Sequence, residues 1–263
     1  MITSKDNPQV KAAVRLRENA RARREQGLFF LEGFRLCADA IASGYLPQTL
    51  FITEAARQKY GVPESPSLPE ESCLLIADAV AQKLGDTSTP QGIFGIFQTV
   101  QSQPDFWQPG GKYIALEQVQ DPGNLGAIAR TAEALGLDGM LVSGGCDVHH
   151  PKALRASMGS LLRLPVMETD DLAETLASEA LASYALPCYA AAPDNSAMPV
   201  GGCDFSKGAV IVIGNEGNGL SEEAIAACNT SSGGSTTIPM RGKAESLNAA
   251  AAATILMWEM MRQ

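Results

Sequence analysis

The sequence lacks any segment that could span a membrane. None of its apolar runs reaches the roughly eighteen residues that a membrane helix requires. The first residues, Met1–Asp6, include no apolar signal segment, so we expect a cytoplasmic protein with no membrane partner. Internal repeats and low-complexity segments are also missing. With 45% hydrophobic and 19% charged residues, the composition is typical of a folded globular chain.

Cysteine and histidine are too few or too scattered to build a metal site. The six cysteines include no Cys-x-x-Cys pair, which argues against a zinc site or a disulfide framework and favours reduced thiols. The two histidines, His149 and His150, are adjacent and therefore face apart. The sequence therefore lacks the ligands for a metal site and the arrangement for a histidine-based catalytic triad. The nucleophile motif Gly-x-Ser-x-Gly is also absent. We expect no bound metal.

The charge is acidic overall but basic at the N-terminal end. A net charge of -9 and a pI of about 4.8 argue against a nucleic-acid partner. Residues 1–35 nevertheless hold eight Lys and Arg against four Asp and Glu, and Arg21, Arg23 and Arg24 are clustered. Such a run is either an arm that holds phosphate locally or the solvated face of a helix. Charge alone leaves both readings open.

Strands and helices alternate in the first hundred residues. Asn7 is predicted to cap a helix that starts at Pro8, and Gly27 is predicted to end it. Further helices are predicted at 35–43 and 78–84. Apolar stretches predict strands at 29–31, 50–53, 73–76 and 93–100. This alternation predicts an α/β sandwich.

Residues 101–111 have the composition of a linker. Their sequence, Gln-Ser-Gln-Pro-Asp-Phe-Trp-Gln-Pro-Gly-Gly, is rich in proline, glycine and polar residues. We place the domain boundary there. The prediction is an N-terminal domain of residues 1–105 and a C-terminal domain of residues 112–263.

The second domain is predicted to contain a parallel sheet. Apolar strands separated by helices are typical of a parallel sheet that is buried on both faces. Predicted strands are 113–116, 139–142, 188–191, 209–213 and 236–238, and predicted helices are 125–135, 152–160, 171–185 and 248–262. Sites in such sheets lie beyond the carboxyl ends of the strands. The turns at that edge are 118–124, 143–147, 214–220 and 239–248.

The stretch 121–130 places the polar residue Asn124 at the start of a predicted helix and the charged residue Arg130 inside it. Pro122 and Gly123 predict a tight turn, and Asn124 is a natural N-cap that would point a polar group into the site. Arg130 follows inside the helix, where an unpaired guanidinium would be costly if buried. We therefore expect Arg130 to have an anionic partner, either a carboxylate or a phosphate.

The stretch 212–223 places three glycines in six positions after an apolar strand. Backbone at these positions is predicted to approach a ligand or another segment closely. The order Gly-x-x-Gly-x-Gly differs from the dinucleotide fingerprint, and no Gly-Lys-Ser/Thr phosphate loop follows. Glu216 and Asp121 would repel phosphates, so a neutral or cationic cofactor fits better.

The stretch 238–253 combines a polar loop with an alanine-rich helix. Pro239 and Gly242 interrupt the loop, and five alanines follow Asn248. Alanine favours helix, but five in succession also leave almost no side-chain bulk, so backbone or a ligand can lie close. A small-residue core helix is an equally good explanation of this stretch taken alone.

Together the three stretches resemble the motifs of the SpoU (TrmH-like) family of RNA 2′-O-ribose methyltransferases, in the SPOUT superfamily. The matching patterns stand in the family's order and spacing: Asn-x-Gly-x-x-x-Arg at 124–130, Gly-Asn-Glu-Gly-Asn-Gly-Leu-Ser at 214–221, and Ile-Pro-Met-x-Gly-x-x-x-Ser-Leu-Asn at 238–248. The resemblance is strong over 112–263. It is weaker in the N-terminal part, where 30–33 and 86–92 are similar to a substrate-binding domain with a ribosomal-protein-like α/β fold.

The resemblance implies a SPOUT-type parallel sheet with a C-terminal trefoil knot that binds S-adenosylmethionine, and a homodimer whose catalytic pocket lies at the interface. The residues that it assigns to the cofactor are Gly214, Asn215, Gly219, Ile238, Met240, Ser246 and Leu247. The residues that it assigns to catalysis are Asn124, Arg130, Glu216, Ser246 and Asn248. Family likeness around 151–159 also places Arg155 on the RNA side.

The implied reaction is displacement of a methyl group from a sulfonium by a ribose 2′-hydroxyl, which needs no metal. Family proposals make Arg130 the base, but arginine keeps its proton in proteins. Arg130 can instead anchor a phosphate and stabilise the developing alkoxide. The expected substrate is structured rRNA or tRNA, with rRNA favoured by the N-terminal domain. Alternatives are a base-methylating relative, a catalytically silent RNA-binding protein and, less favoured, a nucleotide-binding oxidoreductase.

Overall fold

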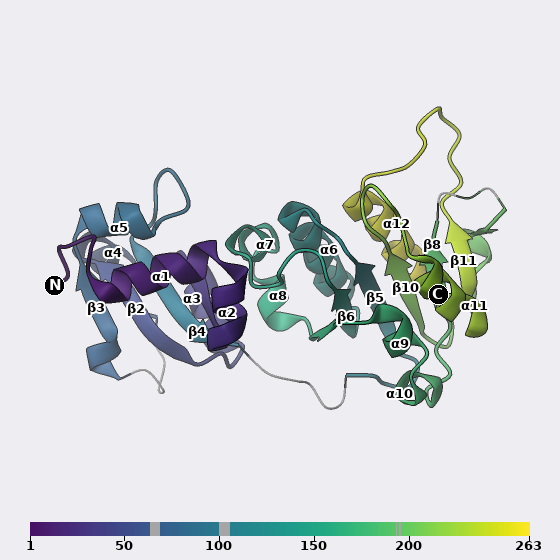
Figure 1. Ribbon diagram of the computed structural model, residues 1–263, viewed down its shortest axis with the longest axis horizontal. Helices are drawn as coiled ribbons and strands as arrows, with labels where there is room; N and C mark the ends of the chain where they lie inside the picture. The colour runs from purple at the N-terminus through teal and green to yellow at the C-terminus, as the bar shows by residue number, and fades with distance from the viewer. Residues whose placement is uncertain (64–68, 100–105, 193, 195) are drawn as a thin grey trace. The chain divides into compact units, whose positions relative to one another are not determined.

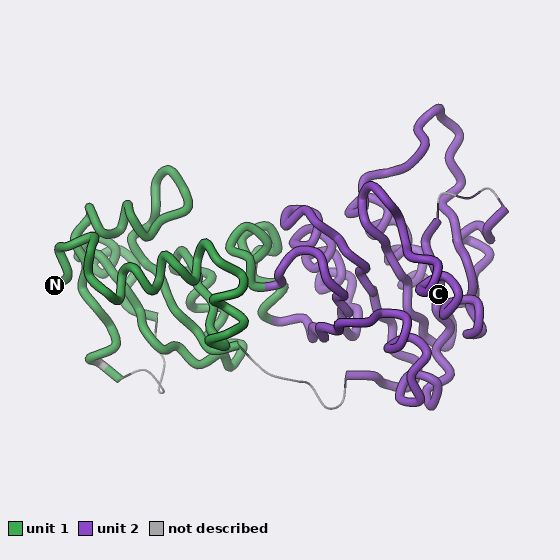
Figure 2. Tube along the Cα trace, viewed as in Figure 1, with its two compact units in different colours: residues 1–101, 149–162 green, residues 102–148, 163–263 purple. Residues whose placement is uncertain are grey.

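The computed structural model describes residues 1–263 except 64–68, 100–105, 193 and 195. The described chain divides into two compact units, one of residues 1–101 and 149–162 and the other of residues 102–148 and 163–263 (Figures 1 and 2). We describe each unit by itself. No helix of the described chain is long and apolar enough to cross a membrane.

The first unit is built on a four-stranded mixed sheet. Its strands are β1 (Leu28–Glu32), β2 (Pro47–Thr53), β3 (Cys73–Ile76) and β4 (Ile93–Gln98), in the order β1-β4-β2-β3. Strand β4 runs antiparallel to both β1 and β2, whereas β2 and β3 are parallel. The helices are α1 (Pro8–Glu18), α2 (Ala20–Gln26), α3 (Phe34–Ala42), α4 (Glu54–Tyr60), α5 (Asp78–Leu84) and α7 (Pro151–Ala156). Its apolar core joins Val10 and Leu16 of α1 to Phe30, Phe51 and Phe94 of the sheet.

The predicted first helix is in fact two helices. Asn7 caps α1 and Gly27 ends α2 in the left-handed region, as predicted. Between them Asn19 adopts an extended conformation (φ -128°, ψ 108°), where its backbone N–H caps α1 and its side chain accepts a bond from Ala22 N at 2.9 Å. Asparagine competes with helical backbone through such local bonds, so the chain turns there.

The second unit is built on a seven-stranded sheet in which every pairing is parallel. Its order is β7-β6-β5-β10-β8-β11-β9. The strands are β5 (Lys112–Glu117), β6 (Gly139–Ser143), β7 (Val166–Thr169), β8 (Cys188–Ala191), β9 (Met198–Pro199), β10 (Ala209–Ile213) and β11 (Gly234–Thr237). The predicted parallel sheet is confirmed. Strands β7 and β9 were not predicted, because β7 is only partly buried and β9 is a two-residue exposed strand that ends in proline.

Helices cover both faces of this sheet (Figure 1). One core cluster joins α9 (Leu172–Leu176) and α11 (Glu222–Thr230) to Tyr113 and Val210. Helix α12 (Ala249–Met261) packs against α6 (Pro122–Leu135) and against β5 and β10. Since all strands are parallel, the loops after β5, β10 and β11 meet at one edge of the sheet.

Two predicted helices of the second half are divided. The predicted 152–160 helix splits into α7 and α8 (Ser160–Arg163), because Met158 and Gly159 both adopt positive φ angles. The predicted 171–185 helix splits into α9 and α10 (Glu179–Ala182), since Ser178 begins a new helix by accepting a bond from Leu181 N.

The predicted linker lies only partly within the described residues. Its positions 101–105 fall outside them. Phe106 and Trp107, in contrast, are buried, and their rings pack against Tyr113. The Tyr113 hydroxyl donates to the Phe106 carbonyl at 3.0 Å, so residues 106–107 belong to the core of the second unit rather than to a free linker.

Candidate functional site

A cavity of about 670 Å³ opens at the carboxyl edge of the seven-stranded sheet. This volume is typical of pockets that hold a cofactor or a drug-sized ligand. The loop after β10, the loop after β11 and the first residues of α12 form its wall. All seven residues that were predicted to bind a cofactor line it: Gly214, Asn215, Gly219, Ile238, Met240, Ser246 and Leu247.

The glycine-rich loop after β10 is closed by its own hydrogen bonds. Asn215 Oδ1 accepts from Gly217 N and Asn218 N, both at 2.9 Å, and Asn215 and Gly219 exchange two backbone bonds of 2.9 Å. A Cβ built on Gly214 would lie 2.3 Å from the Gly219 carbonyl carbon. Glycine at position 214 is therefore required for the loop to close.

A chain of side-chain hydrogen bonds joins the three predicted motifs. Asn248 Nδ2 donates to Asn124 Oδ1 at 3.0 Å, and Asn124 Nδ2 donates to Glu216 Oε1 at 2.9 Å. These residues begin α12, begin α6 and follow β10. The arrangement places three of the five predicted catalytic residues in direct contact.

The cap of α6 is Asp121 rather than Asn124, which corrects the sequence prediction. Asp121 Oδ1 accepts from Gly123 N at 2.5 Å and from Asn124 N, and Pro122 occupies the first helical position. Proline suits this position, because the N–H that it lacks would have no partner within the helix. Because Asp121 caps the helix, the Asn124 amide is available to bridge Glu216 and Asn248.

The Glu216 carboxylate is held ionised by its donors. Burial opposes ionisation, but hydrogen bonds from Asn124 Nδ2 and from the backbone N–H groups of Gln120 and Asp121 outweigh it and lower the Glu216 pKa. The cavity therefore has a negative charge on its rim. This charge suits a cationic or neutral ligand better than a phosphate.

The alanine-rich helix starts at the cavity wall. Asn248 caps α12 by accepting from Ala250 N at 2.9 Å and Ala251 N at 3.2 Å. Ala249 and Ala252 line the cavity. The small side chains thus leave space for the cavity, which the sequence suggested without deciding between a ligand site and a core helix.

The remaining two predicted catalytic residues are placed differently. Ser246 lines the cavity and is exposed. Arg130 is exposed on α6, does not line the cavity, and makes no ion pair among the described residues. Exposure removes the cost of burying an unpaired guanidinium, so a protein carboxylate partner is not needed in this structure.

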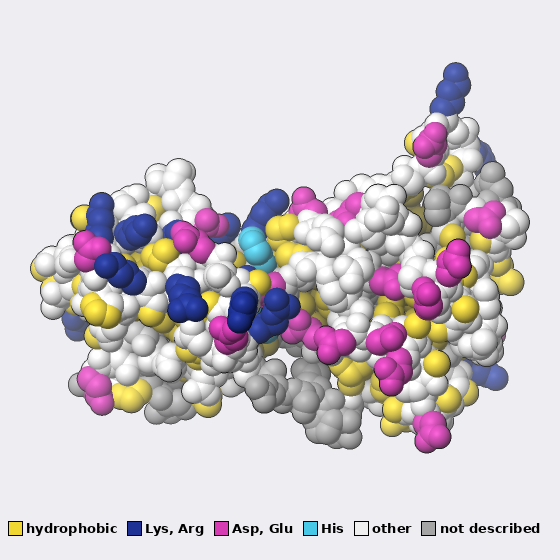
Figure 3. Space-filling model, viewed as in Figure 1, with side chains coloured by type: hydrophobic (Ala, Val, Ile, Leu, Met, Phe, Trp, Pro, Cys, Tyr) yellow, Lys and Arg dark blue, Asp and Glu magenta, His cyan; other side chains and the backbone are white. Residues whose placement is uncertain are grey.

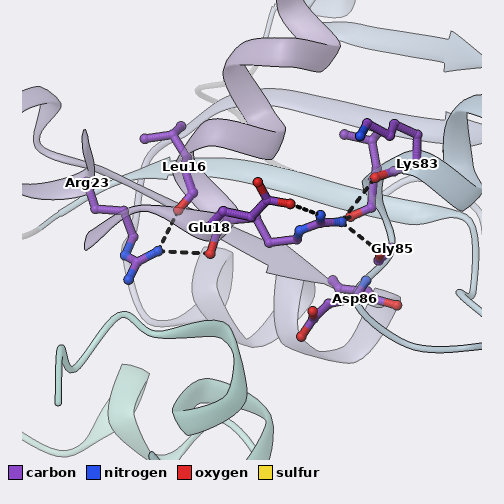
Figure 4. Close-up of polar contacts among 9 residues, drawn as sticks. Leu16, Glu18, Arg23, Lys83, Gly85 and Asp86 are labelled. Carbon is purple, nitrogen blue, oxygen red and sulfur yellow. Dashed lines mark hydrogen bonds and ion pairs between the residues drawn. The ribbon is translucent and has the colours of Figure 1, made fainter. Parts of the chain in front are cut away.

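The predicted RNA-binding arginines fall into two groups. Arg21 and Arg24 are exposed, and Arg21 pairs with Glu25 at 2.6 Å. Arg23 is only 2% exposed and donates to the carbonyls of Leu16 at 2.6 Å and Arg17 at 3.0 Å (Figure 4). A guanidinium held inside the fold cannot present itself to RNA, so the prediction for Arg23 is wrong. Its position in a basic run gave no sign of this burial.

The fourth predicted RNA-binding residue, Arg155, is half-buried. Its guanidinium pairs with Asp86 at 2.6 Å. Both residues belong to the first unit. The backbone N–H of Asp86 in turn donates to the buried Glu32 carboxylate at 2.8 Å. Arg155 therefore contributes to this unit's own packing, and its contact with RNA stays a prediction.

Sequence analysis missed two residues that support the site. Glu117, at the end of β5, accepts from Ser221 N at 2.8 Å and Ser221 Oγ at 2.6 Å and so fixes the end of the glycine-rich loop. Gln118 has a positive φ of 55°, and its carbonyl accepts from Asn215 Nδ2 at 2.8 Å. The signal for both was a charged residue and a glutamine directly after an apolar strand. Among the described residues no cluster of metal ligands is found.

A parallel α/β sheet with a loop-walled cavity at its carboxyl edge defines a ligand-binding α/β domain. Residues 111–258 match the SpoU rRNA Methylase family, and residues 7–95 match the MRM3-like substrate binding domain. The chain therefore belongs to the SpoU rRNA methylase family. The predicted α/β fold with an N-terminal substrate-binding domain is confirmed, and the trefoil knot stays a prediction.

Relatives and solved structures agree with this membership. The chain is 31% identical to an uncharacterised tRNA/rRNA methyltransferase of Synechocystis sp., covering all of this chain and 93% of that protein. It is 28% identical to the 23S rRNA (guanosine(2553)-2′-O)-methyltransferase RlmP of Bacillus subtilis, covering 98% of each. The structure of an AdoMet-bound rRNA methyltransferase from Sinorhizobium meliloti, at 28% identity, superposes with a TM-score of 0.82 over 99% of this chain and 97% of that chain.

Proposed function

We propose that this protein transfers a methyl group from S-adenosylmethionine to a ribose 2′-hydroxyl in structured RNA, with rRNA the expected substrate. The observation that carries the proposal is the Asn248–Asn124–Glu216 chain at the rim of the cavity. It joins the family's three motifs at one point. Relatives named as 23S rRNA 2′-O-methyltransferases support both the reaction and the RNA class.

The cavity suits S-adenosylmethionine by shape and by charge. The cofactor is a sulfonium cation that supplies an electrophilic methyl group when bound. Gly214 lets the glycine-rich loop close at the cavity wall, and the small side chains of Ala249 and Ala252 leave room for a ligand against α12. The ionised Glu216 matches a cationic ligand, and among the residues that the structure describes no lysine or arginine lines the cavity to repel one. The seven predicted cofactor residues would hold it, partly through main-chain groups.

Arg130 would act on the RNA rather than on the cofactor. An exposed guanidinium on α6 is suited to bind the phosphate beside the target ribose and to stabilise the developing alkoxide. Arginine is a poor proton acceptor, which disfavours the role of base. Arg130→Ala is expected to abolish most methyl transfer while S-adenosylmethionine binding is kept. Lys207→Ala serves as the control, because it removes an exposed charge of the second unit away from the cavity and from the outer face of α12.

The first unit is the proposed RNA-binding part. It contains 13 Lys and Arg against 11 Asp and Glu, whereas the second unit contains 7 against 18. Figure 3 shows Lys and Arg gathered over α1 and α2, and Asp and Glu gathered over the second unit. Basic groups on one unit would hold RNA backbone while the acidic unit limits non-specific binding. We therefore propose the predicted N-terminal domain, residues 1–105, as the RNA-binding domain, joined by residues 149–162, which belong to the same compact unit. The rest of 112–263 is proposed as the knotted catalytic domain.

A homodimer is proposed from the outer face of α12. Along this helix Ala251, Thr254, Ile255 and Trp258 form an exposed stripe at helical spacing, with Ile255 40% and Trp258 58% exposed. An apolar stripe on an otherwise buried helix is typical of a subunit interface. Light scattering should give a dimer for the wild type and a monomer for Trp258→Glu. A wild-type monomer would contradict the proposal.

The deciding experiment is methyl transfer from labelled S-adenosylmethionine to RNA from a strain that lacks this protein, followed by digestion to nucleosides. A labelled 2′-O-methylnucleoside in one RNA band is the expected result. Label on a base would support a base-methylating relative instead. Cofactor binding without label on intact rRNA or ribosomal particles would favour a silent RNA-binding protein. Dinucleotide binding without S-adenosylmethionine binding would favour an oxidoreductase.

A further inference from the structure

The first unit contains a cavity of its own, of about 530 Å³. It lies among the start of α4, helix α5 and the segment 89–92. Its volume falls in the range of ligand pockets. The lining combines an aromatic ring, a cation, a carboxylate, amides and hydroxyls, contributed by Tyr60, Lys59, Asp78, Gln82, Gln91, Thr53 and Thr89.

The aromatic group of this cavity is part of a stack. The Tyr60 ring lies on the Phe34 ring with centroids 5.7 Å apart and planes 18° apart. Lys59 Nζ is 5.0 Å from the Tyr60 centroid. Tyr60 is half-buried and Lys59 is exposed. Nucleic-acid bases stack on an aromatic ring that is fixed in this way. Lys59 Nζ lies over the Tyr60 ring, so this long exposed side chain would move from the ring to the adjoining phosphate when a base stacks there.

The polar groups around the ring are available to a ligand. Lys59, Gln82 and Thr89 are exposed and make no hydrogen bond within the part of the chain that the structure describes, although Lys59 Nζ contacts the Tyr60 ring. Gln91 Oε1 accepts from Phe34 N at 3.1 Å, which leaves its amide N–H groups to donate. Mixed donors and acceptors match the edge of a base. A polyphosphate would instead require several cations and no Asp78.

The wall of the cavity is formed by tightly packed backbone. Gly92 has a φ of 79°, and a Cβ there would lie 2.4 Å from Thr53 Oγ1. Thr53 N donates to the Gly92 carbonyl at 2.9 Å, and Thr53 Oγ1 caps α4 by accepting from Ala56 N at 3.2 Å. The segment 89–92 is thus held against the start of α4, so the cavity is formed before any ligand binds.

We propose that this cavity holds one unstacked nucleotide of the RNA substrate. The base stacks on Tyr60, its edge bonds to Gln82, Thr89 and Gln91, and the adjoining phosphate meets Lys59. This inference rests on the proposed function, because it needs RNA as the substrate. It also narrows that substrate: the RNA must present an extruded base, which loops and bulges provide and a continuous helix does not.

The test is binding of the full-length protein to deproteinised large-subunit rRNA from a strain that lacks it, measured against salt. Tyr60→Ala should weaken binding about tenfold or more, since one base–aromatic stack is lost, and Tyr60→Phe should bind as the wild type does. Lys59→Ala should weaken binding and lower the slope against log salt by about 0.7. Gln82→Ala should weaken binding without changing that slope.

Matched controls and a cross-link keep the result interpretable. Lys83→Ala and Gln58→Ala remove the same side-chain types from exposed positions of α5 and α4 outside the cavity. Ultraviolet cross-linking followed by mass spectrometry should place the attached nucleotide on residues 54–60 or 89–92. Tyr60→Ala also removes the contact with Phe34 and could therefore fail to fold. In that case the variants of exposed residues, Lys59→Ala and Gln82→Ala, decide whether the cavity binds RNA.

Three outcomes would overturn the proposal. Lys59→Ala and Gln82→Ala could match their controls, the cross-link could map elsewhere in the chain, or a mixture of free nucleoside monophosphates could bind as tightly as the RNA. If any of these outcomes occurs while the wild type still methylates RNA, the nucleotide site is ruled out but the proposed function stands. If the wild type binds S-adenosylmethionine but neither binds nor methylates RNA, the proposed function fails with it.

Discussion

Asn248 and Asn124 lie 124 residues apart in the chain, yet Asn248 Nδ2 donates to Asn124 Oδ1 over 3.0 Å. The same Asn124 side chain donates to Glu216 Oε1 at 2.9 Å. One amide therefore uses its acceptor toward α12 and its donor toward the glycine-rich loop. Both functions of that amide are needed to hold the three motif loops together, so residue 124 is the position where a substitution is most informative.

Asn124→Ala should lower methyl transfer on the order of 100-fold while S-adenosylmethionine binds within a few-fold of wild type. The physical reason is that the start of α6 and Glu216 lose their shared orientation, and misplacement of about 1 Å near reacting groups costs rates of this size. Single-turnover methyl transfer and calorimetric binding of the cofactor measure the two effects. Asn229→Ala, an exposed asparagine of α11, is the matched control.

Asn124→Asp distinguishes the donor role from the acceptor role. Aspartate keeps the acceptor for Asn248 but replaces the donor to Glu216 by a second carboxylate, and two like charges at this distance repel. Its activity should therefore fall at least as far as that of Asn124→Ala. If Asn124→Asp kept full activity, the bond to Glu216 would be unimportant and only the bond to Asn248 would be needed for activity.

The second prediction concerns pH. Hydrogen bonds lower the Glu216 pKa below its ordinary value of 4.5 despite the opposing effect of burial. A carboxyl group whose folded pKa is lowered stabilises the fold above its ordinary pKa, and that contribution is lost as the pH falls through the lowered value. The wild type should thus be more stable than Glu216→Gln at pH 7, and the difference should shrink below about pH 4.5.

Urea unfolding of both proteins between pH 7 and pH 3 measures this difference. Glu216 is exposed at its outer side, so the difference should be modest. A gap between wild type and variant that stays constant across the whole range would show that the charge of Glu216 does not contribute. The Glu117→Gln variant offers a comparison, because Glu117 accepts two bonds from Ser221 at the other end of the same loop.

The outcome of sequence reasoning can be traced to particular residues. The parallel sheet and the edge that holds the site followed from the pattern of strands and helices, whereas the seven residues that line the cavity came from the resemblance of three motifs to the SpoU family. The predictions that failed concerned which residue caps a helix. Asn19 caps α2 and so divides a predicted helix, and Asp121 caps α6 where Asn124 was expected to do so. Several polar residues in a row can each cap a helix, and only three-dimensional packing selects one.

Burial of single charged residues was equally hidden from the sequence. Arg21, Arg23 and Arg24 look equivalent in a basic run, but only Arg23 faces the C-terminal carbonyls of α1. The neighbouring Arg17 likewise donates to carbonyls at the end of α5, from Lys83 to Gly85 (Figure 4). Helix periodicity could have separated the faces, had the break at Asn19 been foreseen.

The third prediction uses two glycines of one loop. Gly214→Ala should abolish S-adenosylmethionine binding, because the added Cβ would lie 2.3 Å from Gly219 and backbone would have to move. Gly217→Ala should bind normally, since its Cβ would meet only Asn215 Oδ1 at 3.5 Å. Calorimetric titration with the cofactor compares them, and far-ultraviolet circular dichroism checks that both fold. Equal binding by the two variants would contradict the assignment of Gly214 to the cavity wall.

The last prediction separates the arginines of the N-terminal arm. Arg23→Ala leaves the carbonyls of Leu16 and Arg17 without their donor inside the fold, so it should lower the free energy of unfolding by about 1–3 kcal/mol. The double variant Arg21→Ser with Arg24→Ser should leave stability nearly unchanged, because both side chains are exposed. Its RNA affinity should fall, and the dependence of binding on salt should weaken, since two phosphate contacts would be lost. If the double variant kept the affinity and the salt slope of the wild type, the arm would be a solvated helix face and the RNA would have to be held elsewhere on the protein.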